Sequence, residues 1–77
     1  MNNLLFTVSL TADYNWSSGY DCLYVVAAKD DEGAKAIVDE YERWPITRVG
    51  SGYALDIREI GIAKAGLDCG IVQELTT

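Results

Sequence analysis

The sequence contains no histidine, so it lacks the side chain that most often transfers protons in enzymes at neutral pH. Carboxylates can take this role, but the acidic residues are dispersed, and no pair has a spacing that indicates glycosidic or metal-assisted chemistry. The hydroxyls of Ser17 and Ser18 have no base beside them in the sequence. We therefore expect no hydrolytic or transfer activity, and no cofactor is predicted.

Cysteine is nearly as scarce, since the chain has only Cys22 and Cys69. Neither residue has a second cysteine or a histidine at the spacing of a metal-ligand set, so no metal site is predicted. The simplest interpretation is that both are small apolar core residues in a reducing compartment. The alternative is that they pair with each other or react.

Basic residues are few: the sequence has 6 lysines and arginines against 12 aspartates and glutamates, which gives a formal net charge of -6. This balance argues against direct binding to nucleic acid, because lysine and arginine are needed to displace the counterions of the phosphates. A partner with a basic surface suits the charge better. The alternative is that the acidic surface only keeps a small protein soluble and monomeric.

A long apolar run is missing as well. The N-terminal stretch MNNLLFTVSLTAD has no positively charged leader, and its apolar residues alternate with threonine and serine. We therefore expect neither a signal peptide nor a membrane span, and we expect the protein to reside in the cytosol.

The residues that are present predict one small folded domain over residues 1–77. Residues 4–12 alternate apolar and polar side chains, the period of two that indicates a strand with one buried face. Residues 20–28 are apolar on both sides from Cys22 onward, which is typical of a central strand.

The stretch Lys29-Asp30-Asp31-Glu32 indicates a helix start, because an aspartate at the cap accepts backbone N–H groups and further carboxylates favour the positive end of the helix dipole. Apolar residues then follow at helical spacing, namely Ala34, Ile37, Val38, Tyr41 and Trp44. Pro45 ends the predicted helix. On the outer side, Lys35 with Asp39 and Asp39 with Arg43 stand at the i,i+4 spacing of ion pairs.

Residues 46–53 hold two glycines and a serine and predict an irregular connection. Residues 54–63 predict a third strand, whose alternation shifts phase around Glu59-Ile60-Gly61, as a bulge or a bend would cause. Residues 70–75 predict a short fourth strand. The expected fold is α+β: three to four mostly antiparallel strands with one amphipathic helix packed on one face, in the order β-β-α-β-β.

The widths of these elements leave apolar surface uncovered. Four strands make a sheet about 19 Å across, whereas one helix is about 10–12 Å wide. The second apolar side of residues 20–28 therefore needs a cover, which is a loop, a second copy of the chain, or another protein.

The stretch DYNWSSGYD, between the first two predicted strands, carries more aromatic side chains than a turn needs. Tyrosine and tryptophan are the most frequent anchors of protein interfaces. We therefore interpret Tyr14, Trp16 and Tyr20 as docking anchors, flanked by Asp13 and Asp21. The alternative is that Trp16 folds over the open end of a thin core and that Tyr20 belongs to the second strand.

The stretches YVVAAKDDEGAKAIVDEY and LDIREIGIAKAGLDCGIVQE resemble a type of small open reading frame found in phages and mobile elements. The resemblance covers roughly residues 23–74 and rests on the succession of elements. Some short, acidic, histidine-free members of this type are similar to anti-CRISPR and other anti-defence inhibitors, which occupy a site on a host complex. The resemblance implies this style of action and transfers no site residue.

The first functional hypothesis is therefore a non-catalytic, phage-encoded inhibitor in the cytoplasm of the bacterial host, which blocks the basic surface of a protein or nucleoprotein complex. The residues expected to bind are the aromatic stretch named above and the acidic helix face, made of Asp30, Asp31, Glu32, Asp39 and Glu42. Two alternatives stay open: a self-associating structural or accessory phage protein that forms a homodimer, and a module that sequesters a small ligand.

Overall fold

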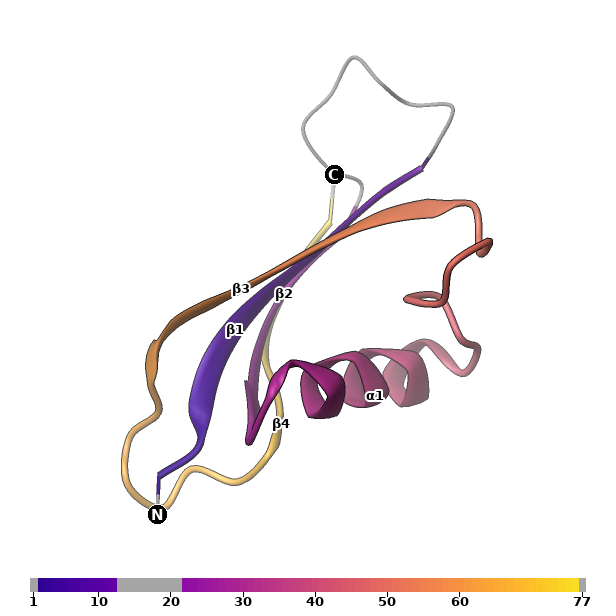
Figure 1. Ribbon diagram of the computed structural model, residues 1–77. Coiled ribbons are helices and arrows are strands. Elements are labelled where there is room, and N and C mark those ends of the chain that lie inside the picture. The colour runs from indigo at the N-terminus through magenta and orange to yellow at the C-terminus, as the bar shows by residue number, and fades with distance from the viewer. Residues whose placement is uncertain (1, 13–21, 77) are drawn as a thin grey trace.

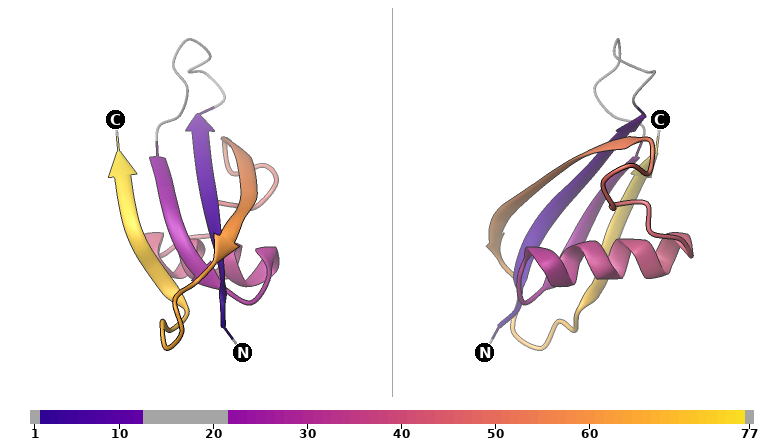
Figure 2. Two further views of the ribbon diagram at one scale, coloured as in Figure 1. Left: turned by 90° about the vertical axis from the view of Figure 1, so that its left-hand side faces the viewer. Right: turned by 45° about the vertical axis from the view of Figure 1, so that its right-hand side comes forward.

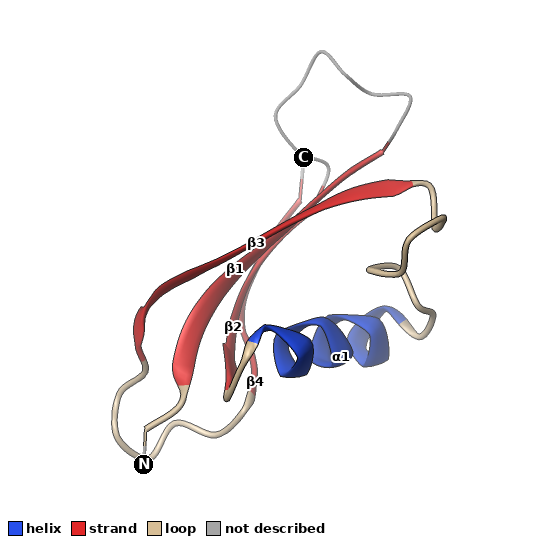
Figure 3. Ribbon diagram, in the orientation of Figure 1, coloured by secondary structure: helices blue, strands red, loops and turns tan. Residues whose placement is uncertain are grey.

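The computed structural model describes residues 2–12 and 22–76, which form a four-stranded sheet and one helix in the predicted β-β-α-β-β order (Figures 1 and 3). The α+β fold expected from the sequence is confirmed. The elements are β1 (Leu4–Ala12), β2 (Cys22–Ala28), α1 (Asp31–Glu42), β3 (Tyr53–Ile62) and β4 (Gly70–Thr76).

The strands lie in the order β3-β1-β2-β4, and every neighbouring pair is antiparallel. The two strands that come first in the chain are therefore central, while β3 and β4 form the edges (Figure 2). Val8 in β1 stands opposite both Tyr24 in β2 and Ile57 in β3. This register aligns the apolar rows of three strands on one face.

The period of two predicted for the strands is present. Phe6, Val8 and Leu10 are buried on the face toward α1, while Thr7 and Ser9 between them point to the other face. The second strand is apolar on both faces, as predicted from its unbroken run of apolar residues. One row of its side chains enters the core, and the other row lies on the face away from the helix.

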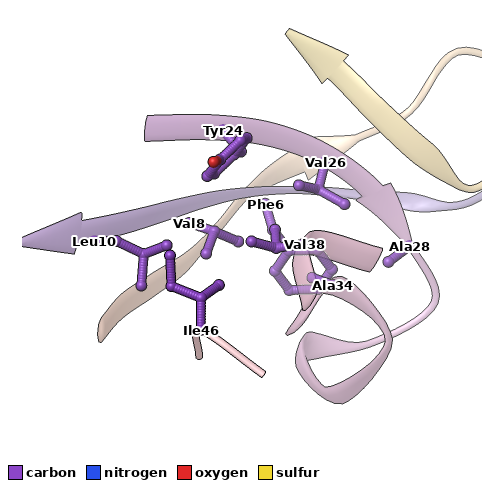
Figure 4. Packing of buried hydrophobic residues seen from close by; sticks show 9 residues of the cluster. All are labelled: Phe6, Val8, Leu10, Tyr24, Val26, Ala28, Ala34, Val38 and Ile46. Carbon is purple, nitrogen blue, oxygen red and sulfur yellow. The ribbon is translucent and has the colours of Figure 1, made fainter. Parts of the chain in front are cut away.

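One helix and one loop together cover the inner face of the sheet. The helix crosses the strands instead of running along them, and the connection after it returns over the other half of the same face (Figure 2). This connection places Ile46, which is 3% exposed, in the core beside Leu10 (Figure 4). The cluster consists of Phe6, Val8, Leu10, Tyr24, Val26, Ala28, Ala34, Val38 and Ile46.

The helix begins as the sequence predicts and ends earlier. The Oδ1 atom of Asp30 accepts the backbone N–H of Gly33 at 2.7 Å, which is the capping bond expected of an aspartate. Arg43 adopts the left-handed conformation with φ of 65°, and its N–H donates to the carbonyl of Glu40 at 3.2 Å. The helix therefore stops before Trp44, because a left-handed residue reverses the chain before Pro45 does.

The phase shift predicted within the third strand is a β-bulge. Phe6 pairs with Glu59 and Leu5 pairs with Gly61, so Ile60 is an extra residue on β3. The fourth strand has a similar irregularity at Val72, which is skipped in the pairing with β2. Both edge strands are thus interrupted, which hinders the addition of a further strand at either edge.

Candidate binding surface

The aromatic stretch that the sequence singles out lies outside the described residues. It belongs to the connection between β1 and β2, and its role as a docking loop stays a prediction. The five residues concerned are Asp13, Tyr14, Trp16, Tyr20 and Asp21.

The acidic residues at the start of α1 border a groove of about 340 Å³. The N-cap residue Asp30 and the first helical residue Asp31 line it from the start of α1, and Glu59 lines it from β3; all three are exposed. Its other lining residues are Leu4, Phe6, Lys29 and Ile57. Within the described residues, the side chains of Asp31 and Glu59 form no hydrogen bond or ion pair. We call this site the acidic groove; it presents carboxylates above an apolar floor, an arrangement that fits a cationic side chain.

Glu32 lies in the same first turn but is engaged along the helix. Its Oε1 atom is 3.0 Å from the Nζ atom of Lys35, and this interaction raises the pKa of Lys35. The sequence had predicted that Lys35 pairs with Asp39 and that Asp39 pairs with Arg43. Both predictions are wrong, because Lys35 turns toward the helix start and Asp39 is occupied elsewhere.

Asp39 anchors the connection that follows the helix. Its Oδ1 atom accepts the backbone N–H of Thr47 at 2.9 Å, and the hydroxyl of Thr47 donates to the same carboxylate at 3.0 Å. Asp39 is half-buried on α1, and its carboxylate holds the loop that carries Ile46 into the core. Asp39 was predicted to belong to an exposed acidic face, but its contacts give it a structural role.

Glu42 also turns inward. The hydroxyl of Tyr24 donates a hydrogen bond to Oε2 of Glu42, and Tyr24 is fully buried. Burial and the neighbouring Glu42 carboxylate raise the pKa of Tyr24 well above its usual value. The predicted acidic face is therefore divided, with Asp30, Asp31 and Glu32 exposed at the helix start and Glu42 bonded to the core.

Replacing Asp39 with alanine is expected to lower the free energy of unfolding by about 1–2 kcal/mol, because the backbone N–H and the hydroxyl of Thr47 lose a charged acceptor. Urea denaturation followed by circular dichroism measures this change. Glu40→Gln is the matched control, since it removes a charge from the neighbouring exposed position. Equal effects of the two substitutions would show that charge and not the hydrogen bonds causes the loss.

Three exposed apolar side chains near the helix end were not predicted as surface residues. Tyr41 is 51% exposed and donates to Oε1 of Glu74 at 2.6 Å, while Trp44 is 41% exposed and packs edge-on against Tyr53. Val49 is 98% exposed in the loop that follows the helix. Helical spacing assigned both aromatic residues to the core side, because each lies at the border of the apolar stripe where the sequence does not separate core from surface.

The two cysteines are far from each other, at opposite ends of the sheet. Cys22 is half-buried and packs against the core, next to the end of β1. Cys69 is exposed, and its Sγ atom donates to Oδ1 of Asn3, just before the start of β1. The prediction that both are core residues is wrong for Cys69, because the loop before β4 lies at the sheet end, where no element of the described chain buries this side chain.

No group of three or more metal-ligating side chains occurs in residues 2–12 and 22–76, and α1 falls short of the length and apolar character that a membrane crossing requires. No protein-family model, curated protein or solved structure matches this chain. The candidate function therefore follows from the chain's own residues.

Proposed function

We propose that this protein is a non-catalytic binding protein that inhibits a bacterial nucleic-acid-handling defence complex by covering a basic surface of that complex. The observation that carries the proposal is the acidic groove, where two different elements bring Asp31 and Glu59 to one concave site. Both side chains are exposed and form no bond with the rest of the described chain. Their hydrogen-bonding capacity is available to a partner.

Carboxylates accept from a guanidinium group the same paired hydrogen bonds that a phosphate accepts. A groove that normally binds nucleic acid with arginine is therefore the natural counterpart of Asp31 and Glu59. The apolar floor of the groove, formed in part by Phe6 and Ile57, suits the aliphatic stem of an arginine or lysine.

The position of these carboxylates is fixed by the fold. Asp30 is held by its bond to the Gly33 N–H, which sets the start of the helix and hence the direction of Asp31. Glu59 stands at the β3 bulge, opposite Phe6. A site placed on regular elements loses little conformational entropy when a partner binds.

The proposed setting is the cytoplasm of a bacterial host, in line with the phage-type resemblance and the net charge of -6. The partner is a protein or nucleoprotein complex with a basic surface, and no direct contact with nucleic acid is proposed. The aromatic residues Tyr14, Trp16 and Tyr20 are proposed as a second contact that adds apolar area to the electrostatic contact.

Affinity capture from bacterial lysate, followed by mass spectrometry, identifies the partner. Binding is then compared between the wild type and the double variant Asp31→Asn, Glu59→Gln, which removes two charges from the groove. We expect the double variant to bind at least 10-fold more weakly. The matched control is Glu40→Gln, Asp68→Asn, which removes two exposed charges from positions that do not line the groove.

Salt dependence provides an independent test of the same proposal. Raising the ionic strength from about 0.05 to 0.5 M shortens the Debye length from above 10 Å to below 5 Å, so binding through the acidic groove should weaken. A partner that binds the groove variant as tightly as the wild type, with no dependence on salt, would refute the acidic mechanism.

A further inference from the structure

The helix and the loop after it lie on the same side of the sheet, and no other described element packs on the opposite side (Figures 1 and 2). We call this opposite side the open face. The strand register assigns to it Leu5, Thr7, Ser9 and Thr11 of β1, Leu23, Val25 and Ala27 of β2, Ala54, Asp56 and Arg58 of β3, and Gln73 and Leu75 of β4.

The apolar part of the open face lies on β2 and the neighbouring edge strand β4. Leu23 pairs with Leu75 across β2 and β4, and the half-buried Val25 follows Leu23 on the same side of β2. Leu75 is 41% exposed although it lies beside two other apolar side chains. In a sheet with one solvated face, the side chains on that face are ordinarily polar. The β1 side chains on the open face follow this rule at Thr7 and its neighbours Ser9 and Thr11, whereas the β2 side chains on the same face are apolar.

The open face is also electrically neutral, in contrast to the chain as a whole. Its charged residues are Asp56 and Arg58, and these pair with each other at 3.1 Å. The other charged strand residues, Glu59 and Glu74, belong to the helix side, since they stand opposite the buried Phe6 and Tyr24. The single carboxylate among the described residues of the open face, that of Asp56, is already paired with Arg58, so the face offers little to a basic partner, whereas an identical face meets it without net charge repulsion.

The size of the face agrees with a small self-complementary interface. At about 3.4 Å per residue and about 4.8 Å between strands, four strands of about seven residues present roughly 24 by 19 Å. When two such faces stack, they bury on the order of 900 Å² of flat surface in total, and protruding side chains add to this area. Specific interfaces begin near ~1,000 Å², so we expect a dissociation constant in the micromolar range.

We propose that the open face pairs with the open face of a second copy of this chain to form a symmetric dimer. The two sheets then stack at about 10 Å, with the β2 rows of both copies in contact across the two-fold axis. Both helices and both acidic grooves stay on the outside. The dimer does not involve the acidic groove, so an experiment can refute the dimer without refuting the proposed function, and the reverse.

Sedimentation equilibrium of the purified chain from low to high micromolar concentration tests the proposal. We expect the mass to rise from near 8.5 kDa toward twice that value. Leu75→Glu places two carboxylates in the interface and should weaken the dimer at least 10-fold. Val25→Thr, which keeps the side-chain shape, should weaken it less while the circular dichroism spectrum stays unchanged. Val49→Glu is the matched control, because this side chain is 98% exposed on the helix-side loop.

Raising the ionic strength should leave the wild-type dimer intact or strengthen it, because the face is neutral while each copy carries a net charge of -6. This is the opposite of the response expected for the acidic groove. A wild-type mass near 8.5 kDa at the highest concentration would overturn the proposal. A dimer that Leu75→Glu and Val25→Thr leave unchanged would overturn it as well, since a different surface would then join the copies.

Discussion

Replacing Leu10 with alanine is expected to lower the free energy of unfolding by about 3–5 kcal/mol. Leu10 is fully buried near the end of β1 and contacts the loop residue Ile46 (Figure 4). The cavity left by alanine cannot close easily, because the sheet backbone is held by pairing on both sides of β1. A domain of this length has only about 4–12 kcal/mol of stability in total, so the variant should be close to unfolding at room temperature.

Urea denaturation monitored by circular dichroism measures this loss. Ser9→Ala is the control, because Ser9 precedes Leu10 in the same strand but points to the open face. At low micromolar concentration, where the chain is expected to be monomeric, the control should change the free energy of unfolding by less than about 0.5 kcal/mol. A Leu10→Ala variant that loses less than about 1 kcal/mol would contradict a core closed by Ile46.

Features that depend on neighbouring residues were predictable from the sequence. The alternation of Phe6, Val8 and Leu10 follows from the strand period, and the cap at Asp30 follows from the needs of a helix start. The bulge at Ile60 was visible as a break in that same period. Each of these signals lies within a few positions of the chain, where periodicity and local hydrogen bonding decide the structure.

Contacts between separate elements were not predictable in this way. Glu42 looks like an exposed helix residue in the sequence, yet its partner Tyr24 lies 18 positions earlier, on a strand under the helix. Similarly, Asp39 meets Thr47 only because the left-handed Arg43 reverses the chain. The helical period of a sequence predicts on which side of the helix a side chain lies. It does not predict which residue of another element that side chain contacts.

The candidate site shows the same limit. Asp31 was predicted as a binding residue, but Glu59 was not, because the two lie far apart in the sequence and meet only through the strand order β3-β1-β2-β4. The open face was anticipated from β2, whose apolar residues exceed what one helix covers. Its neutrality depends on the register that places both Asp56 and Arg58 on that side.

Replacing Tyr24 with phenylalanine is expected to lower the free energy of unfolding by about 2 kcal/mol at neutral pH, because the Glu42 carboxylate loses its buried hydrogen-bond donor. The aromatic ring and its edge-on contact with Tyr41, at 5.9 Å between centroids, are retained. Phenylalanine also fits the volume of the site, so the decrease in the free energy of unfolding reports the contribution of the hydroxyl and its hydrogen bond to Glu42.

The same substitution is expected to be far less harmful in alkali. Burial and Glu42 raise the pKa of Tyr24, so the folded state keeps this proton while the unfolded chain releases it above its pKa of about 10. The unfolded state then binds fewer protons, and the free energy of unfolding of the wild type falls with rising pH, by about 1.4 kcal/mol for this group at about pH 11. The phenylalanine variant lacks this loss, so the two stability curves should converge between about pH 10 and 11.

Urea titrations across this range measure the convergence, with Tyr41→Phe as the control, because Tyr41 is 51% exposed and its removal should leave the alkaline loss of Tyr24 in place. Parallel curves for the wild type and Tyr24→Phe would mean that the Tyr24 hydroxyl ionises alike in the folded and unfolded chains, which a phenol buried against Glu42 does not allow.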